Sequence, residues 1–245
     1  MRCARGGAPA WGYAPRMRTI GLLGGMSWES SALYYSLINQ GVRDVLGGLH
    51  SARCVMASVD FAEIERLQVA GDWETAGARL ADEARSLETA GADFLVLCTN
   101  TMHKVAAAIE RSAGIPLLHL GDVTADAVTA GGIETVGLLG TRFTMEQDFY
   151  VDRITAHGPT VLTPATDDRA VVHDIIYSEL VLGTVTDTSR TAYQDVITRI
   201  VERGAQGIIL GCTEIEMLIG AEDSSVPVFP TTRLHAEAAV RMALA

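Results

Sequence analysis

Two short polar clusters in this chain combine residue types that can move protons. Thr99-Asn100-Thr101 lies at the end of the apolar run 94–98, and Cys212-Thr213-Glu214 follows the apolar run 208–210. A cysteine thiol ionises within reach of neutral pH, whereas a threonine hydroxyl is a very poor base that can still donate or relay a proton. A thiol on one side of a substrate and a hydroxyl on the other are suited to removing and returning a proton at one carbon atom.

The two clusters belong to an internal repeat. The aligned segments are 91–101 with 204–214, at an offset of 113 residues, and 19–25 with 135–141, at an offset of 116 residues. Chance matches of short apolar runs seldom recur in the same order at nearly the same offset. In this register Thr99 corresponds to Cys212, so the sequence predicts two copies of one half that face each other across a pseudo-twofold cleft.

Each of these residues also has a structural explanation when it is considered alone. An isolated cysteine is more often buried and inert, and we interpret Cys98 in this way because it would point to the wrong side of the chain. Thr99 alone would be a helix cap or a turn residue. Cys212 precedes Thr213-Glu214-Ile215, which is expected to open a short helix whose dipole and free amides stabilise a thiolate. The repeat register favours the catalytic interpretation of Thr99 and Cys212.

Alternating strand and helix patterns position both clusters at one edge of a sheet. Apolar runs separated by helical stretches are typical of parallel sheets covered on both faces, which bind ligands at the carboxyl ends of their strands. We therefore predict an α/β fold with two similar, doubly wound, Rossmann-like parallel-sheet halves. The predicted strands are 20–23, 54–59, 94–98, 115–118, 136–139, 160–162, 208–210 and 226–229. The predicted helices include 28–46, 72–90, 102–111, 145–154, 170–182, 189–203 and 234–244.

The repeat also suggests a domain division. Residues 17–125 with about 225–245 form the first predicted domain, and residues 126–224 form the second. Residues 1–16 are rich in Gly, Ala, Pro and Arg and have no secretory h-region. Because Met17 directly precedes the first predicted strand, we expect these sixteen residues to be a disordered extension or an artefact of start-site choice, with a transit peptide as the alternative.

Composition excludes several classes of partner. The net charge of −11, without a basic stripe, argues against nucleic acid and anionic membranes, and an anionic substrate would need local donors against this field. No apolar run approaches the length of a membrane span. Four cysteines without CxxC or metal-type spacing predict a reduced, cytoplasmic enzyme with no metal site. Gly21-Leu-Leu-Gly24 lacks the G-x-G-x-x-G spacing, so a nicotinamide cofactor is unsupported.

Taken together, the clusters resemble the motifs of the aspartate/glutamate racemase superfamily, which are usually Cys-Asn-Thr and Gly-Cys-Thr. Here they read Thr99-Asn100-Thr101 and Gly211-Cys212-Thr213. Thr99 in place of the first cysteine makes the chain most similar to the L-aspartate/L-glutamate-specific subgroup, which carries a Thr/Cys pair. The resemblance runs from about Met17 to the C-terminus. It is carried by segments 21–30, 58–61, 97–103, 139–150 and 211–215.

The resemblance implies an activity and a partner. The chain is expected to interconvert L- and D-glutamate and/or aspartate by two-base proton transfer at Cα, without a cofactor, as a homodimer. Cys212 is assigned to the face of the L-enantiomer and Thr99 to the opposite face, so turnover should favour the L-enantiomer. Two alternatives stay open: a cofactor-independent decarboxylase or isomerase on the same scaffold, and a catalytically silent amino-acid-binding module.

The resemblance also assigns the remaining site residues. Asn100, Thr101 and Thr213 would hold the α-carboxylate and the developing enolate, and Glu214 would either orient Cys212 or cap its helix. The residues assigned to substrate binding are Met26, Gln68, Asn100, Thr101, Thr141, Thr144 and Thr213. The glycine turns at 24–27 and 140–144 would offer free N–H groups to an anion, unless glycine only permits the turn there. Relatives carry Lys where this chain has Val171, so either Arg169 replaces that Lys or the substrate differs.

Overall fold

Two four-stranded parallel sheets form the framework of the protein. The computed structural model describes residues 17–245, so the extension expected over residues 1–16 lies outside the described part. The first sheet has the order β2-β1-β3-β4 and the second the order β6-β5-β7-β8. The strands are β1 (Ile20–Gly24), β2 (Cys54–Ser58), β3 (Phe94–Leu97), β4 (Leu117–Leu118), β5 (Thr135–Gly140), β6 (Thr160–Leu162), β7 (Ile208–Gly211) and β8 (Val228–Pro230). The two orders are identical when β1 to β4 are matched with β5 to β8, which confirms the predicted α/β fold of two similar halves.

The central strands are buried on both faces, as parallel sheets require. Every residue of β1, β3 and β7 is buried. Leu23 of β1 is paired with Leu97 of β3, and Gly140 of β5 is paired with Gly211 of β7. Within each half, the two paired strands therefore end side by side. The polar clusters that follow these strands lie at the same edge of their sheet.

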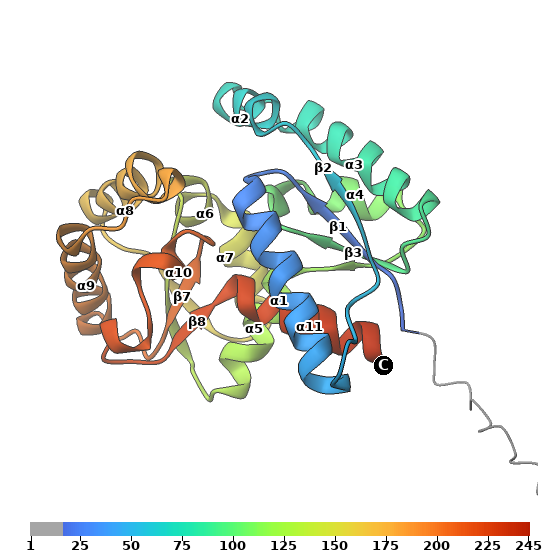
Figure 1. The fold of residues 1–245 in the computed structure, drawn as a ribbon. Helices are drawn as coiled ribbons and strands as arrows, with labels where there is room; N and C mark the ends of the chain where they lie inside the picture. Colours follow the sequence, from blue (N-terminus) through green and yellow to red (C-terminus); the bar gives the residue numbers. More distant parts are fainter. Residues whose placement is uncertain (1–16) are drawn as a thin grey trace, which may run out of the picture.

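Helices cover both faces of each sheet (Figure 1). The first sheet packs against α3 on one face and against α1 and α11 on the other, and the second sheet packs against α8 and α9 on one face and α5 and α7 on the other. The helices are α1 (Trp28–Leu46), α2 (Phe61–Ala70), α3 (Trp73–Thr89), α4 (Ala106–Ser112), α5 (Leu120–Ala130), α6 (Arg142–Glu146), α7 (Asp148–Thr155), α8 (Thr166–Ser178), α9 (Asp187–Glu202), α10 (Ile215–Leu218) and α11 (Thr231–Leu244). Short 3₁₀ turns lie at Thr101–Val105, Leu180–Leu182 and Ala221–Asp223.

The helices differ from the predicted ones in several places. The stretches α2 and α5 were not among the predicted helices, and in α2 only Ile64 and Gln68 are buried, which leaves a weak apolar pattern. The predicted helix 145–154 is divided into α6 and α7 because Gln147 has extended backbone angles (φ −108°, ψ 139°). The predicted helix 102–111 begins as a 3₁₀ turn that carries part of the first polar cluster.

The chain crosses between the halves at its C-terminal end. Because β8 pairs with β7, residues 228–230 lie in the second sheet, although the sequence placed residues from about 225 in the first domain. The helix α11 then lies beside α1, and its Ala236 and Val240 share a core with Ile38 of α1 (Figure 1). Among residues 17–245, no helix combines the length and the apolar composition that crossing a membrane would require.

Candidate active site

A polar cavity lies where the strand ends of the two halves meet. It encloses about 50 Å³ and is bordered by the turns that follow β1, β3, β5 and β7. Nine of the residues singled out in the sequence line it: Met26, Gln68, Thr99, Asn100, Thr101, Thr141, Cys212, Thr213 and Glu214. Sequence reasoning assigned no role to the lining residues Ser30, Phe61, Ile176, Tyr177 and Val181, whereas Ser27 and Gly211 belong to the turn and the motif that it placed at this edge.

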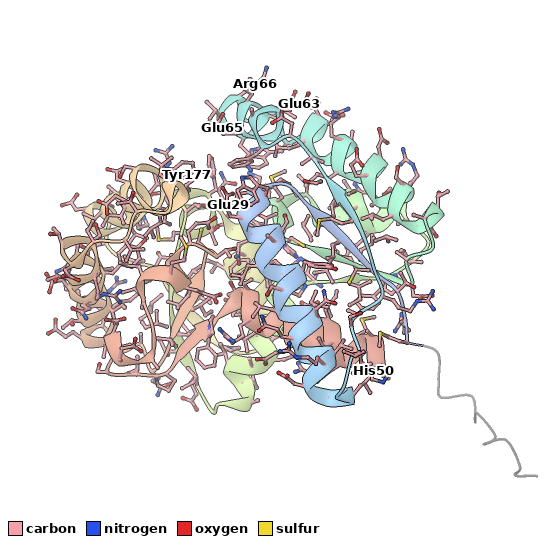
Figure 2. The ribbon with its side chains drawn as sticks, in the orientation of Figure 1. Glu29, His50, Glu63, Glu65, Arg66 and Tyr177 are labelled. Carbon is pink, nitrogen blue, oxygen red and sulfur yellow. The ribbon has the colours of Figure 1, made fainter. Side chains whose placement is uncertain are left out.

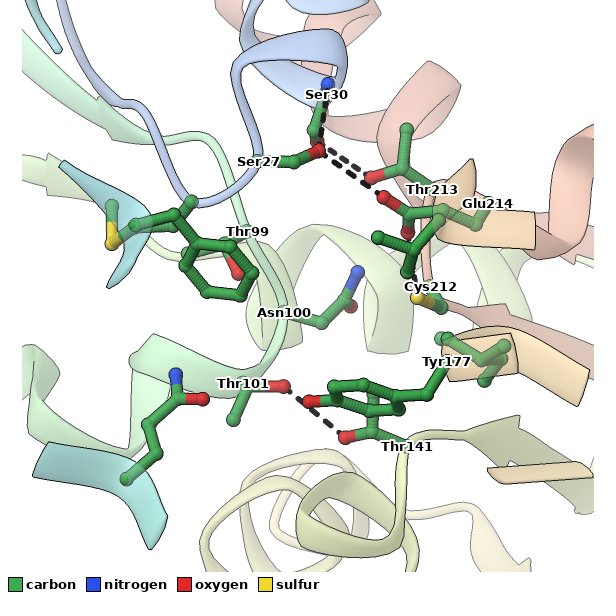
Figure 3. Close-up of a pocket in the computed structure, with 16 residues that line it drawn as sticks. Ser27, Ser30, Thr99, Asn100, Thr101, Thr141, Tyr177, Cys212, Thr213 and Glu214 are labelled. Carbon is green, nitrogen blue, oxygen red and sulfur yellow. Dashed lines mark hydrogen bonds between the residues drawn. The ribbon is translucent and has the colours of Figure 1, made fainter. Parts of the chain in front are cut away.

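Thr99 and Cys212 lie on opposite sides of this cavity, with Asn100 between them (Figure 3). Both residues are buried to the same degree, with 9% of their surface exposed. Thr99 follows β3, and Cys212 follows β7, its repeat mate. The cavity thus presents a hydroxyl and a thiol from two sides to whatever occupies the space between them.

Turn geometry near β1 fixes one wall of the cavity. Gly25 has a positive φ of 95°, and a Cβ there would lie 2.2 Å from the carbonyl oxygen of Val59, so only glycine fits this turn. Ser27 follows and caps α1 by accepting a hydrogen bond from the backbone N–H of Ser30. The next cavity residues of this wall, Ser27 and Ser30, are therefore held at the first turn of α1.

The thiol of Cys212 donates a hydrogen bond to the carboxylate of Glu214. The distance from Sγ to Oε2 is 2.8 Å, and Ser27 Oγ donates to the other carboxylate oxygen at 3.3 Å (Figure 3). Glu214 makes no side-chain cap to α10. Of the two roles considered for Glu214, the observed contact is therefore the one to Cys212.

The expected stabilisation of a Cys212 thiolate is outweighed by opposing effects: the backbone N–H of Glu214 lowers the pKa of the thiol, but the net shift is upward. Burial, followed by the negative charge of Glu214, raises the pKa of the Cys212 thiol well above its ordinary value. The helix α10 has only four residues, Ile215–Leu218, so its dipole is a small effect beside the loss of water. The thiol is protonated in the unliganded protein, and the adjacent carboxylate is its hydrogen-bond acceptor.

Replacing Glu214 by glutamine is expected to lower the pKa of the Cys212 thiol. The carboxylate raises this pKa by its charge and by accepting the thiol proton, and neutral glutamine removes the charge. Alkylation of Cys212 by iodoacetamide, followed by peptide mass spectrometry as a function of pH, should have its midpoint at lower pH in Glu214→Gln. Glu216→Gln is the matched control. Glu216 has the smallest effect on the pKa of the Cys212 thiol, so its replacement should move the midpoint less. An unchanged or higher midpoint in Glu214→Gln would contradict this assignment.

Cys98 does not face the cavity, in agreement with the interpretation from the sequence. It is completely buried, its Sγ lies 3.7 Å from the carbonyl oxygen of Val96, and it packs in the core between β3 and α1. Burial raises the pKa of the Cys98 thiol far above neutrality. Its location makes it a natural control for experiments on Cys212.

The Asn100 side chain is oriented by Thr231 and keeps an unpartnered oxygen and a second N–H proton. Thr231 Oγ donates its single proton to the carbonyl oxygen of Leu210 at 2.8 Å, so it can only accept from the Asn100 amide, which lies 3.2 Å away. This orients the amide nitrogen toward Thr231 and leaves Asn100 Oδ1 buried without a partner. Because the amide nitrogen has a second proton, the expected contact of Asn100 with a substrate carboxylate stays a prediction.

A row of three hydroxyls extends from the cavity into the second half. Thr101 Oγ lies 3.2 Å from Thr141 Oγ, which lies 3.2 Å from Thr144 Oγ. Thr144 is completely buried and does not line the cavity, contrary to expectation, because it lies behind Thr141 in the first turn of α6. Thr213 belongs to a separate contact, with its hydroxyl 2.7 Å from that of Ser30 on α1.

The proposed replacement of a lysine by Arg169 is also wrong. Neither Val171 nor Arg169 lines the cavity. Arg169 is instead occupied on the surface of the second half, where it donates to Glu146 at 3.1 Å and to the carbonyl oxygen of Pro164 at 2.9 Å.

His103 supports the Thr99 turn and was missed in the sequence. Its Nε2 accepts from the backbone N–H of Leu120 at 3.2 Å, so Nδ1 carries the proton and donates to the carbonyl oxygen of Thr99 at 2.7 Å. Burial lowers the pKa of His103 well below its ordinary value, which keeps the ring neutral. Its spacing of four residues from Thr99, on the same turn, is the signal that could have identified it.

The two matched α/β halves share a cavity that presents a thiol from one side and a hydroxyl from the other. The sequence model of the Asp/Glu/Hydantoin racemase family matches residues 23–239, so the chain belongs to this family. This confirms the superfamily resemblance seen in the sequence.

Individual proteins are similar over most of the chain. The crystal structure of a candidate Asp/Glu racemase from Yersinia pestis is 56% identical, with a TM-score of 0.89 over 94% of this chain and 100% of that one. The crystal structure of PH1733, an aspartate racemase homologue from Pyrococcus horikoshii OT3, is 29% identical, with a TM-score of 0.83 over 93% and 99% of the two chains. The broad specificity amino-acid racemase RacX of Bacillus subtilis is 24% identical over 68% of this chain and 71% of its own length.

Proposed function

We propose that this enzyme racemises a free α-amino acid by transferring protons at Cα between Cys212 and Thr99, with faster turnover of the L-enantiomer. The observation that carries the proposal is the position of these two groups on opposite sides of one cavity (Figure 3). Inverting a carbon centre requires a proton to leave one face and another to arrive at the opposite face. Glutamate and aspartate, which the family resemblance implies, are the reference substrates for testing it.

The polar groups of the cavity suit the two ends of an amino acid. The unpartnered Asn100 Oδ1 is an acceptor and is matched to the α-ammonium group. The hydroxyls of Thr101, Thr141 and Thr144 have three protons, but only two hydrogen bonds join these hydroxyls, so one proton is left over. When the row donates from Thr144 through Thr141 to Thr101, the Thr101 proton is left for the α-carboxylate, and the buried Thr144 orients this donor.

Glu214 gives Cys212 a route to its reactive form. The buried thiol is protonated at rest, and its proton can pass to Glu214 Oε2, which already accepts it at 2.8 Å. The thiolate then removes the Cα proton of the L-enantiomer, and the electron pair is spread into the carboxylate. The hydroxyl of Thr99 delivers or relays a proton to the other face. The poor basicity of an alcohol makes the step that begins at Thr99 the slow one.

The proposal predicts exchange of the Cα hydrogen with solvent. Incubation of the enzyme with an L-amino acid in D₂O should remove the Cα–H signal from the proton NMR spectrum and produce the D-enantiomer, which chiral chromatography detects. Release of CO₂ without racemisation would instead support the decarboxylase alternative, which needs only one cysteine. Binding with neither reaction would support the amino-acid-binding module.

Three further statements about this enzyme stay predictions. They are its assembly as a homodimer, its cytoplasmic location and its independence of added cofactors. Sedimentation, and activity after chelation and dialysis, would test the first and the last.

A further inference from the structure

The cavity contains one negative charge and no positive one. Among its sixteen lining residues there is no Lys, Arg or His, and Glu214 is the one carboxylate. Glu214 is already engaged by the thiol of Cys212 and the hydroxyl of Ser27. Any further anion placed in the cavity would share this confined space with a like charge.

The cations nearest to the cavity are directed elsewhere. Arg169 pairs with Glu146, and Lys104 contacts Gln147 and lies 4.1 Å above the ring of Trp73. Arg142 is exposed and acts on Tyr177 only as the weakest of the charges around it. None of these three side chains lines the cavity.

Part of the cavity wall is apolar. Met26, Phe61, Ile176 and Val181 supply carbon surface to the cavity. Tyr177 lies beside them, and burial raises its pKa to about 12, so it presents a neutral hydroxyl. This wall suits an aliphatic or neutral polar side chain.

The edge of the protein beside the cavity carries charges of both signs. Glu29 at the start of α1, Tyr177 on α8, and Glu65 and Arg66 on α2 lie along the same edge of the protein (Figure 2). Arg142, which acts on Tyr177, adds a second guanidinium near this edge, and the chain as a whole carries −11. Entry of an anion is therefore opposed by the global field.

We propose that the physiological substrate is an α-amino acid with an uncharged side chain rather than a dicarboxylic acid. The inference rests on the proposed racemase function and narrows its substrate class. A side-chain carboxylate would have to be stripped of water without a cation and beside Glu214, whereas an amide of the same shape would not.

Isosteric substrate pairs test this proposal directly. Initial rates of Cα–H exchange in D₂O should be measured for L-glutamine against L-glutamate and for L-asparagine against L-aspartate. Each pair differs only in the charge of the side chain. In at least one of the two pairs, we expect kcat/KM for the amide to be at least about tenfold higher than kcat/KM for the acid. Higher values for both acids would overturn the substrate class while leaving the racemase function intact, and no exchange with any amino acid would overturn both.

A charge introduced into the wall provides an independent measurement. Gln68 lines the cavity and is 5% exposed, so Gln68→Lys would place an ammonium group there. Val69→Lys is the matched control, because the neighbouring Val69 is 72% exposed and adds the same charge outside the cavity. The glutamate-to-glutamine ratio of kcat/KM should rise at least about tenfold in Gln68→Lys and little in Val69→Lys. Equal ratios in the two variants would overturn the electrostatic selection.

Discussion

Cys212→Ala is expected to reduce turnover of the L-enantiomer by about three orders of magnitude, because a positioned acid or base contributes about 10²–10⁴-fold to a proton transfer. No other thiol of the described residues lines the cavity, so none can replace Cys212. The carboxylate of Glu214 is hydrogen-bonded to the Cys212 sulfur, so it is not placed to act on the substrate carbon itself. Loss of Cα–H exchange with the L-substrate in D₂O is the measurement. Binding of the substrate should survive, since Asn100 and Thr101 are unchanged.

The fold of the Cys212→Ala variant should also survive. The substitution removes one sulfur atom at the edge of a polar cavity and should change the free energy of unfolding by about 1 kcal/mol. Thermal unfolding and circular dichroism check this. Cys98→Ala is the control, because that thiol is buried in the core away from the cavity and its loss should leave turnover near normal. Near-normal exchange by a folded Cys212→Ala protein would show that Cys212 is not the base.

The fold could be predicted because its signals are local. The strands β1, β3 and β7 are apolar on both faces, and their repeats lie at nearly constant offsets in the chain. The helix α2 escaped prediction because only Ile64 and Gln68 of its residues are buried. Its boundaries are instead set by Asp60, which caps its first turn, and by Gly71, which ends it with φ 71°.

Chemical states in the site depend on contacts that no local pattern contains. A cysteine before a helix predicts a stabilised thiolate, but burial and the Glu214 carboxylate reverse the direction of the pKa shift. Asn100 is oriented by Thr231, which is 131 residues away in the sequence. The sequence identified the residues that meet in the cavity, whereas the direction of each hydrogen bond required the three-dimensional arrangement.

The two sides of the cavity also differ in their supporting groups. Cys212 has a carboxylate within hydrogen-bond distance, whereas Thr99 is held through its backbone carbonyl by the neutral ring of His103. A base at position 99 would therefore have no neighbouring acceptor for its own proton comparable to Glu214. The chemical asymmetry of the pair is thus reinforced by its surroundings.

This asymmetry should appear in the kinetics of the two enantiomers. Their equilibrium constant is unity, so kcat/KM must be equal for the L- and D-substrates, and the bias has to appear as a higher kcat together with a higher KM for the L-enantiomer. Progress curves from each enantiomer measure these constants. Equal kcat values in the unmodified enzyme would indicate that Thr99 is structural.

Thr99→Cys is expected to raise kcat for the D-enantiomer by at least about tenfold, and much more than kcat for the L-enantiomer. A thiol, with an ordinary pKa of about 8.5, can act as a base near neutral pH, whereas an alcohol cannot. Thr99→Ser is the matched control, because it keeps the hydroxyl and should keep the bias toward the L-enantiomer. If Thr99→Cys brings no gain with the D-substrate, the second proton-transfer group lies elsewhere in the cavity, and the pairing of Thr99 with Cys212 through the repeat describes the fold alone.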